Sequence, residues 1–141
     1  MARPSIKGMI AARKAFQALP DATREALFAA TEETAARVQF AAKQRVKRRH
    51  GFLEQHIEKR VSKRSGFAAV GVTKGAETTP DGTRAEPWRY AHLVEFGGVR
   101  LHAQPFMIPA AEQEKAPFLA RYKAAGAAIE RNMANIGMRN L

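Results

Sequence analysis

The segment at residues 87–111 constrains the fold most, because glycine and proline divide it into elements of fixed order. Tyr90, Leu93 and Val94 have the spacing of one helix face, which predicts a short amphipathic helix. Gly97 and the glycine after it can end this helix, since glycine readily adopts the left-handed conformation common at helix C-termini. The first part of the segment therefore predicts a helix with a glycine stop.

The second part of the segment predicts a short extended stretch and then a new helix. Residues 99–104 are expected to be extended, and Pro105 holds the chain in that conformation. Pro109 suits the first turn of a helix, where its missing N–H would have had no partner. This helix is expected to kink or restart at Pro117 and to keep its spacing to Gly137.

The first half of the chain predicts a long helix and two strands. Between Asp21 and Arg49, apolar and small residues recur near the 3.6-residue period, and Gly51 is expected to end the helix. Residues 52–74 alternate between apolar and charged around a turn at 62–66, which predicts two antiparallel strands. The helical stripe consists of Leu27, Thr31, Thr34, Val38, Ala41 and Val46.

The remaining segments complete one domain over residues 1–141. Residues 1–19 are expected to form an N-terminal arm or a short helix. Residues 74–87 are rich in glycine, threonine and proline and predict an exposed loop. The expected fold is α+β, with a long N-terminal helix, a small antiparallel β-sheet and a C-terminal helix packed on the sheet.

The net charge of +11 is concentrated in the middle of the chain. Residues 43–64 hold nine lysines and arginines against two glutamates, a net charge of +7. Such a surface attracts DNA phosphates or the acidic face of another protein, although a solvated helix end explains part of it. The candidate contact residues are Lys43, Arg45, Lys47, Arg48, Arg49, Lys59, Arg60, Lys63 and Arg64.

The sequence carries no motif for catalysis, and it has no cysteine for disulfides or thiol chemistry. Neither a nucleophile elbow nor a phosphate-binding glycine loop is present. His92, Glu95 and His102 lack the spacing of a metal site. We therefore expect no catalytic residues, no metal, no cofactor and no small-molecule substrate. No apolar run approaches the roughly 18 residues of a membrane span, so no membrane partner is expected.

Glu95 stands between two large apolar neighbours, Val94 and Phe96. A carboxylate that is buried there needs a charged or hydrogen-bonding partner. Arg89, Arg100 and a neighbouring subunit are the candidates that the sequence offers.

Three short motifs follow one another in a fixed order along the chain. The pattern Tyr-Ala-x-x-Val-Glu-x-Gly is followed by Pro-Phe-x-x-Pro-Ala, and a Gly-x-Leu element with an isoleucine lies upstream of both. This order resembles the neck or tail-completion protein family of long-tailed bacteriophages and prophages, although His56 stands where that family usually has serine. The matching residues are Gly51, Leu53, Ile57, Tyr90, Ala91, Val94, Glu95, Gly97, Pro105, Phe106, Pro109 and Ala110.

The resemblance implies a structural virion protein that is made in the host cytoplasm and joins the DNA-filled head to the tail. It further implies a ring-type homo-oligomer, with a hexamer among the candidate stoichiometries, around double-stranded DNA. Head-connector and tail proteins would be its other partners. The alternative, which rests on charge alone, is a basic nonspecific DNA-binding protein. Candidate subunit contacts in and beside the loop are Asp81, Arg84, Trp88 and Arg89.

Overall fold

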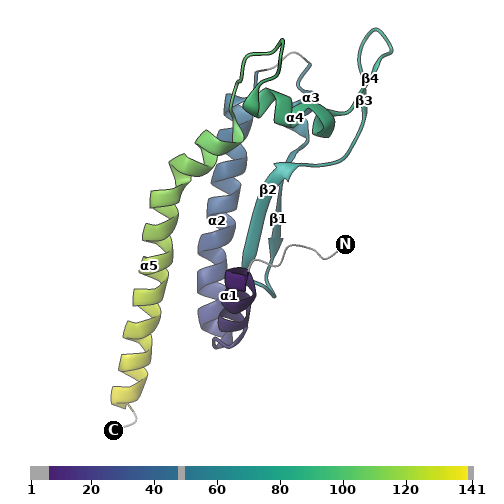
Figure 1. The fold of residues 1–141 in the computed structure, drawn as a ribbon. Helices are drawn as coiled ribbons and strands as arrows, with labels where there is room; N and C mark the ends of the chain where they lie inside the picture. The colour runs from purple at the N-terminus through teal and green to yellow at the C-terminus, as the bar shows by residue number, and fades with distance from the viewer. Residues whose placement is uncertain (1–6, 48–49, 140–141) are drawn as a thin grey trace.

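The computed structural model describes residues 7–47 and 50–139, and its architecture is α+β (Figure 1). Two long helices, α2 and α5, lie side by side, and a β-hairpin packs against α2. The elements in chain order are α1 (Lys7–Gln17), α2 (Asp21–Arg45), α3 (Phe52–Gln55), β1 (Ile57–Ser62), β2 (Phe67–Val72), β3 (Glu77–Thr78), β4 (Arg84–Ala85), α4 (Pro87–Phe96) and α5 (Met107–Arg139). The fold class predicted from the sequence is confirmed.

Helix α2 ends at Arg45, four residues before the predicted end. Val46 leaves the helix with φ −67° and ψ 125° and is only 6% exposed, because its side chain enters the core in an extended conformation. Gly51 does not end α2 but precedes α3 with φ +76°, a conformation that glycine adopts without strain. Arg48 and Arg49 lie outside the described residues.

The buried face of α2 is built mainly from alanine, which lets neighbouring elements approach closely. Thr31 and Thr34 also lie on this side, where each hydroxyl donates to the carbonyl four residues earlier, at 3.1 and 2.9 Å. These bonds satisfy the donor of each hydroxyl within the helix itself. The buried residues of the helix are Leu27, Ala30, Ala35, Ala41 and Ala42.

Strands β1 and β2 form an antiparallel hairpin in which Ile57 pairs with Val72 and Ser62 with Phe67. The two predicted strands are thus confirmed, but residues 52–55 form the helix α3 rather than strand. Helix α1 lies beside the far end of the hairpin (Figure 1). There Phe16 packs on Gly66, which has φ +71° at the turn.

Residues 74–87, the predicted exposed loop, contain a second antiparallel hairpin. Strands β3 and β4 pair Glu77 with Ala85 and Thr78 with Arg84. The Thr79 N–H donates to the Thr83 carbonyl at 2.8 Å, which closes the turn. This hairpin projects away from the helices (Figure 1).

The connection from α4 to α5 differs from the predicted strand. Gly97, with φ +78°, ends α4 and donates its N–H to the Leu93 carbonyl at 2.8 Å, so the glycine stop is present. A tight turn follows, closed by two hydrogen bonds between Gly98 and Leu101. Helix α5 starts two residues before Pro109 and continues through Pro117 and Gly137 as one element.

The core gathers where α2, α3, α4 and the start of α5 meet (Figure 1). Its largest fully buried side chains include Phe106 and Ile57. Burial of one large apolar side chain contributes about 1.5–3 kcal/mol, so this cluster fixes the relative positions of four helices. The cluster is Ala41, Ala42, Val46, Leu53, Ile57, Phe106 and Ala110. Among the described residues, no helix is both long enough and apolar enough to span a bilayer.

Candidate functional site

Glu95 caps the N-terminus of α5 from the last turn of α4. Its Oε2 accepts the N–H groups of Phe106 and Met107, each at 2.9 Å, and its Oε1 accepts the N–H of Ile108 at 2.9 Å. The side chain is buried, with 7% of the residue exposed. Its partner is therefore a helix end and not Arg89, Arg100 or a neighbouring subunit.

The charge of Glu95 complements the helix end that it caps. Burial raises the pKa of the carboxyl group, but the three backbone N–H groups of residues 106–108 outweigh it and hold the pKa below its usual value. The first N–H groups of a helix have no intrahelical partner and carry partial positive charge, which an ionised carboxylate satisfies. The motif glutamate thus locks α4 to α5.

The twelve motif residues have four structural roles. Leu53, Ile57, Phe106 and Ala110 belong to the buried core, and Tyr90, Ala91 and Val94 pack against it. Gly51 and Gly97 have positive φ angles, which glycine adopts without strain, and Glu95 is the helix cap. Pro105 is exposed before α5, and Pro109 stands in its first turn. The structure therefore gathers most of the motif around the α4–α5 junction.

Five exposed apolar side chains surround this junction, and we call them the apolar tip. Val99 in the tight turn is completely exposed, at 104%, and Phe96 at the end of α4 is 71% exposed. A monomeric protein rarely keeps large apolar groups together on its surface unless they serve an interface. The sequence analysis did not predict this patch, although apolar residues stand on both sides of the two glycines. The members are Leu93, Phe96, Val99, Leu101 and Ile108.

The four predicted subunit-contact residues lie along the β3–β4 hairpin and the start of α4. Lys74 and Arg89 place their charged groups 5.3 and 5.2 Å from the centre of the Trp88 ring. Arg84 and Arg89 both contact Glu86, at 3.3 and 3.0 Å. This arrangement stiffens the hairpin base, because cation–π and ion-pair contacts converge on it.

Asp81, the fourth of these residues, holds the hairpin turn. The Thr79 hydroxyl donates to its carboxylate, and the Thr83 N–H donates to the same oxygen at 3.3 Å. These hydrogen bonds, the Thr79 hydroxyl foremost, lower the pKa of Asp81. Asp81 therefore has a local structural role whether or not it contacts a neighbour.

The basic residues predicted as one contact surface are divided by the fold. Lys59 and Lys63 on and beside β1 face acidic residues of α2, with Lys59 at 3.9 Å from Glu32 and Lys63 at 3.2 Å from Glu25. Arg45 donates to Gln113 of α5 and to the carbonyl of its own helix. Among the predicted basic residues that the structure describes, those without a carboxylate partner are Lys43, Arg45, Lys47, Arg60 and Arg64.

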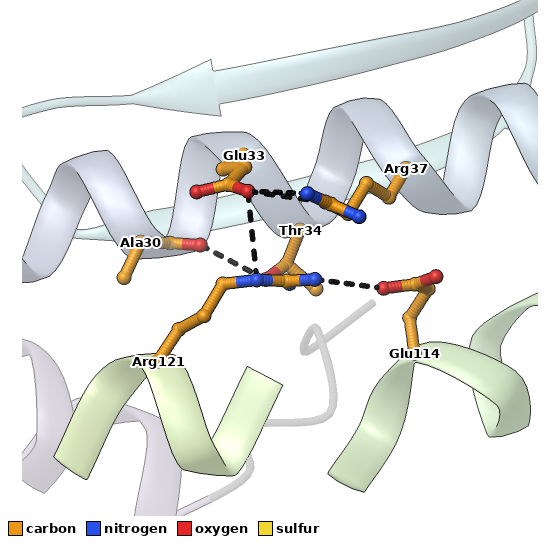
Figure 2. A network of polar contacts seen from close by, with 6 residues as sticks. All are labelled: Ala30, Glu33, Thr34, Arg37, Glu114 and Arg121. Atoms are coloured by element: carbon orange, nitrogen blue, oxygen red, sulfur yellow. Dashed lines mark hydrogen bonds and ion pairs between the residues drawn. The ribbon is translucent and has the colours of Figure 1, made fainter. Parts of the chain in front are cut away.

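Arg121 joins the two long helices through a polar network (Figure 2). It donates to the Thr34 hydroxyl of α2 at 2.8 Å and to Glu114, about two turns earlier on the same face of α5, at 3.2 Å. Glu33 lies 3.6 Å from it and also pairs with Arg37. Glu114 is 8% exposed, so Arg121 neutralises a buried carboxylate. The sequence did not point to this network.

No cluster of three His, Asp or Glu side chains positioned to hold a metal ion occurs in the described parts of the chain. The chain matches the family model described as "Bacteriophage HK97-gp10, putative tail-component" over residues 11–97, more than half of its length. The match runs from within α1 to the glycine that ends α4, and α5 lies beyond it. Searches of curated proteins and of solved structures find no match.

Proposed function

Because the chain belongs to the HK97-gp10-like family of phage tail components, as its motifs indicate, we propose that it joins head and tail in the virion. In this proposal several copies form a closed ring at the top of the tail, around the DNA passage. Its role is structural, and the proposal includes no catalysed reaction. Head-connector and tail proteins are its other partners.

The apolar tip carries this proposal. Its residues are held in place by the Glu95 cap and by the Gly97 conformation, so the patch is rigid although it is exposed. A rigid apolar patch loses little conformational entropy when a partner covers it, which favours binding. The tip therefore has the properties of a preformed subunit contact.

A second apolar site lies on α5 and suits the opposite side of such a contact. Leu119 and Tyr122 are 49% and 36% exposed, and Leu119 lies twelve residues beyond the start of α5 at Met107. Twelve residues of helix extend about 18 Å, so this site is separate from the tip. When two different patches meet, copies add head to tail and form a ring if the rotation closes.

The alternative of a free nonspecific DNA-binding protein has less support. Three of the candidate basic residues, Arg45, Lys59 and Lys63, contact side chains of the same chain. These intramolecular contacts partly satisfy the three side chains, so they contribute less positive charge to a surface that could face DNA.

The test is the molecular mass in solution, measured by light scattering over a range of protein concentrations. We expect one defined oligomer for the wild-type chain and a monomer for the double variant F96S/V99S. Both side chains are exposed, so the folded monomer should keep its far-UV circular dichroism and its melting temperature.

Phe40→Ser is the matched control, because Phe40 is 66% exposed on α2 and does not belong to the tip. This variant should keep the wild-type mass. A wild-type chain that stays monomeric up to about 1 mM, where a contact is worth only about 4 kcal/mol, contradicts the ring. An oligomer that survives F96S/V99S shows that the tip is not the contact.

A further inference from the structure

A polar pocket of about 450 Å³ lies between α1 and the turn that joins β1 to β2. Two of the residues that line it are arginines, two are serines and one is glutamine, and no carboxylate takes part. These side chains offer many hydrogen-bond donors and positive charge to one small volume. They are Arg13, Gln17, Ser62, Arg64 and Ser65.

The fold brings the two arginines together although they are far apart in the sequence. Phe16 is 8% exposed and packs on Gly66, where a Cβ atom would approach its ring to 2.8 Å. Gln17 donates its side-chain amide to the Arg64 carbonyl at 3.5 Å. These contacts hold the last turns of α1 against the strand turn and thereby place Arg13 beside the pocket.

The two guanidinium groups of the pocket are not neutralised. Within residues 7–47 and 50–139, neither Arg13 nor Arg64 has a carboxylate partner, whereas the adjacent Lys63 is paired with Glu25. The Arg13 guanidinium lies 5.8 Å from the centre of the Phe67 ring, which orients it without removing its charge. Ser62 already accepts the Ser65 N–H at 3.3 Å, so the turn is ordered.

We propose that this pocket binds a phosphate group of the DNA backbone. The planar guanidinium matches a phosphate with two parallel N–H donors, and serine hydroxyls add further donors. Only the source of the phosphate rests on the proposed function, which places DNA next to the protein. Such a contact reads no base sequence, as suits a protein through which the whole genome passes. Arg13 was absent from the contact residues predicted from the sequence.

The experiment measures binding of a fluorescein-labelled 24-base-pair duplex of arbitrary sequence by anisotropy, across a range of salt concentrations. Each neutralised phosphate adds about 0.9 to the slope of log affinity against log salt. The variant R13Q/R64Q removes this one phosphate contact, so it should reduce that slope by about 0.9 and weaken binding about tenfold at the lowest salt. Both side chains are exposed, so circular dichroism and melting should not change.

The matched control is K115Q/K123Q, which removes two exposed positive charges from α5. It should leave the salt slope unchanged. Equal losses for the two double variants would show that only net charge matters and would overturn the pocket. Absence of duplex binding by the wild-type chain, or tighter binding to a labelled glutamate-rich peptide, would overturn DNA as its occupant.

The mass measurement separates this inference from the proposed ring. If R13Q/R64Q forms the wild-type oligomer and binds DNA with the wild-type slope, only the phosphate pocket fails. If the wild-type chain is monomeric but its DNA binding depends on Arg13 and Arg64, the pocket stands and the ring fails.

Discussion

At the scale of single residues, Glu95 has the clearest physical role in the chain. In the native chain, the two carboxylate oxygens of Glu95 accept three backbone N–H groups. Glu95→Gln keeps one oxygen acceptor but removes the negative charge and replaces the other oxygen with an NH₂ group, which cannot accept. Hydrogen bonds to charged groups contribute about 1.5–3 kcal/mol, so we expect a loss of about 1–3 kcal/mol in the free energy of unfolding. Urea denaturation measures it. Glu112→Gln, an exposed change on α5, should cost less than about 0.5 kcal/mol.

The same residue predicts how stability depends on pH. The native pKa of Glu95 is lowered, since three N–H donors outweigh the effect of burial. The unfolded chain therefore binds a proton more readily, and the contribution of Glu95 is complete above the unfolded value of about 4.3. It is lost as the pH falls through the native pKa. The stability gap between wild type and Glu95→Gln should thus shrink on acidification, and a constant gap would contradict the cap.

Gly97 and Gly98 are adjacent and have opposite tolerance for a side chain. Gly97 has φ +78°, and a Cβ there would lie 2.9 Å from the Ala103 nitrogen and 3.0 Å from the Leu101 oxygen, both backbone atoms. A Cβ at Gly98 would meet only a Leu93 methyl group, at 3.7 Å. We expect Gly97→Ala to cost about 1–3 kcal/mol and Gly98→Ala less than about 0.5 kcal/mol, measured by thermal and urea unfolding.

At the scale of elements, Arg121 joins α5 to α2. Arg121→Met should cost about 2–3 kcal/mol, because it leaves the buried Glu114 without its partner. Adding Glu114→Gln to this variant should recover part of the loss, with a coupling of about 1 kcal/mol in the double-mutant cycle. The exposed pair of Lys63 and Glu25 should couple by less than about 0.5 kcal/mol. Equal couplings would show that burial does not strengthen the Arg121 contact.

Patterns among neighbouring residues predicted the helices and strands better than the contacts that connect them. The β1–β2 hairpin follows from alternation around a turn, and the stop after α4 follows from glycine, so both could be read from neighbouring residues. The end of α2 could not, because Val46 leaves the helix to fill a core assembled from distant segments. The Glu95 cap spans up to 13 residues and the Arg121 bond to Thr34 spans 87. Such pairings depend on tertiary packing, which periodicity does not encode.

At the scale of the whole molecule, the β3–β4 hairpin is separable from the body. No residue from 76 to 86 is buried. Glu77 of β3 contacts the body through His56, the residue after α3, with 3.1 Å between Glu77 Oε1 and His56 Nε2. Paired strands lie about 5 Å apart, so the hairpin begins and ends close together and a short linker can replace it. The body should therefore fold without it.

We predict that replacing residues 77–85 with a short Gly-Ser linker changes the free energy of unfolding by less than about 1 kcal/mol but abolishes the oligomer. The reason is that the hairpin reaches beyond the helices and carries Arg84 and the turn around Asp81 away from the body (Figure 1). Light scattering and urea denaturation of one preparation test both parts. D81A/R84A keeps the backbone of the hairpin, so it tests whether these two side chains, and not the strands themselves, make the subunit contact. An unfolded linker variant would show that the hairpin belongs to the core, and an oligomer of wild-type mass would restrict subunit contacts to the apolar tip and α5.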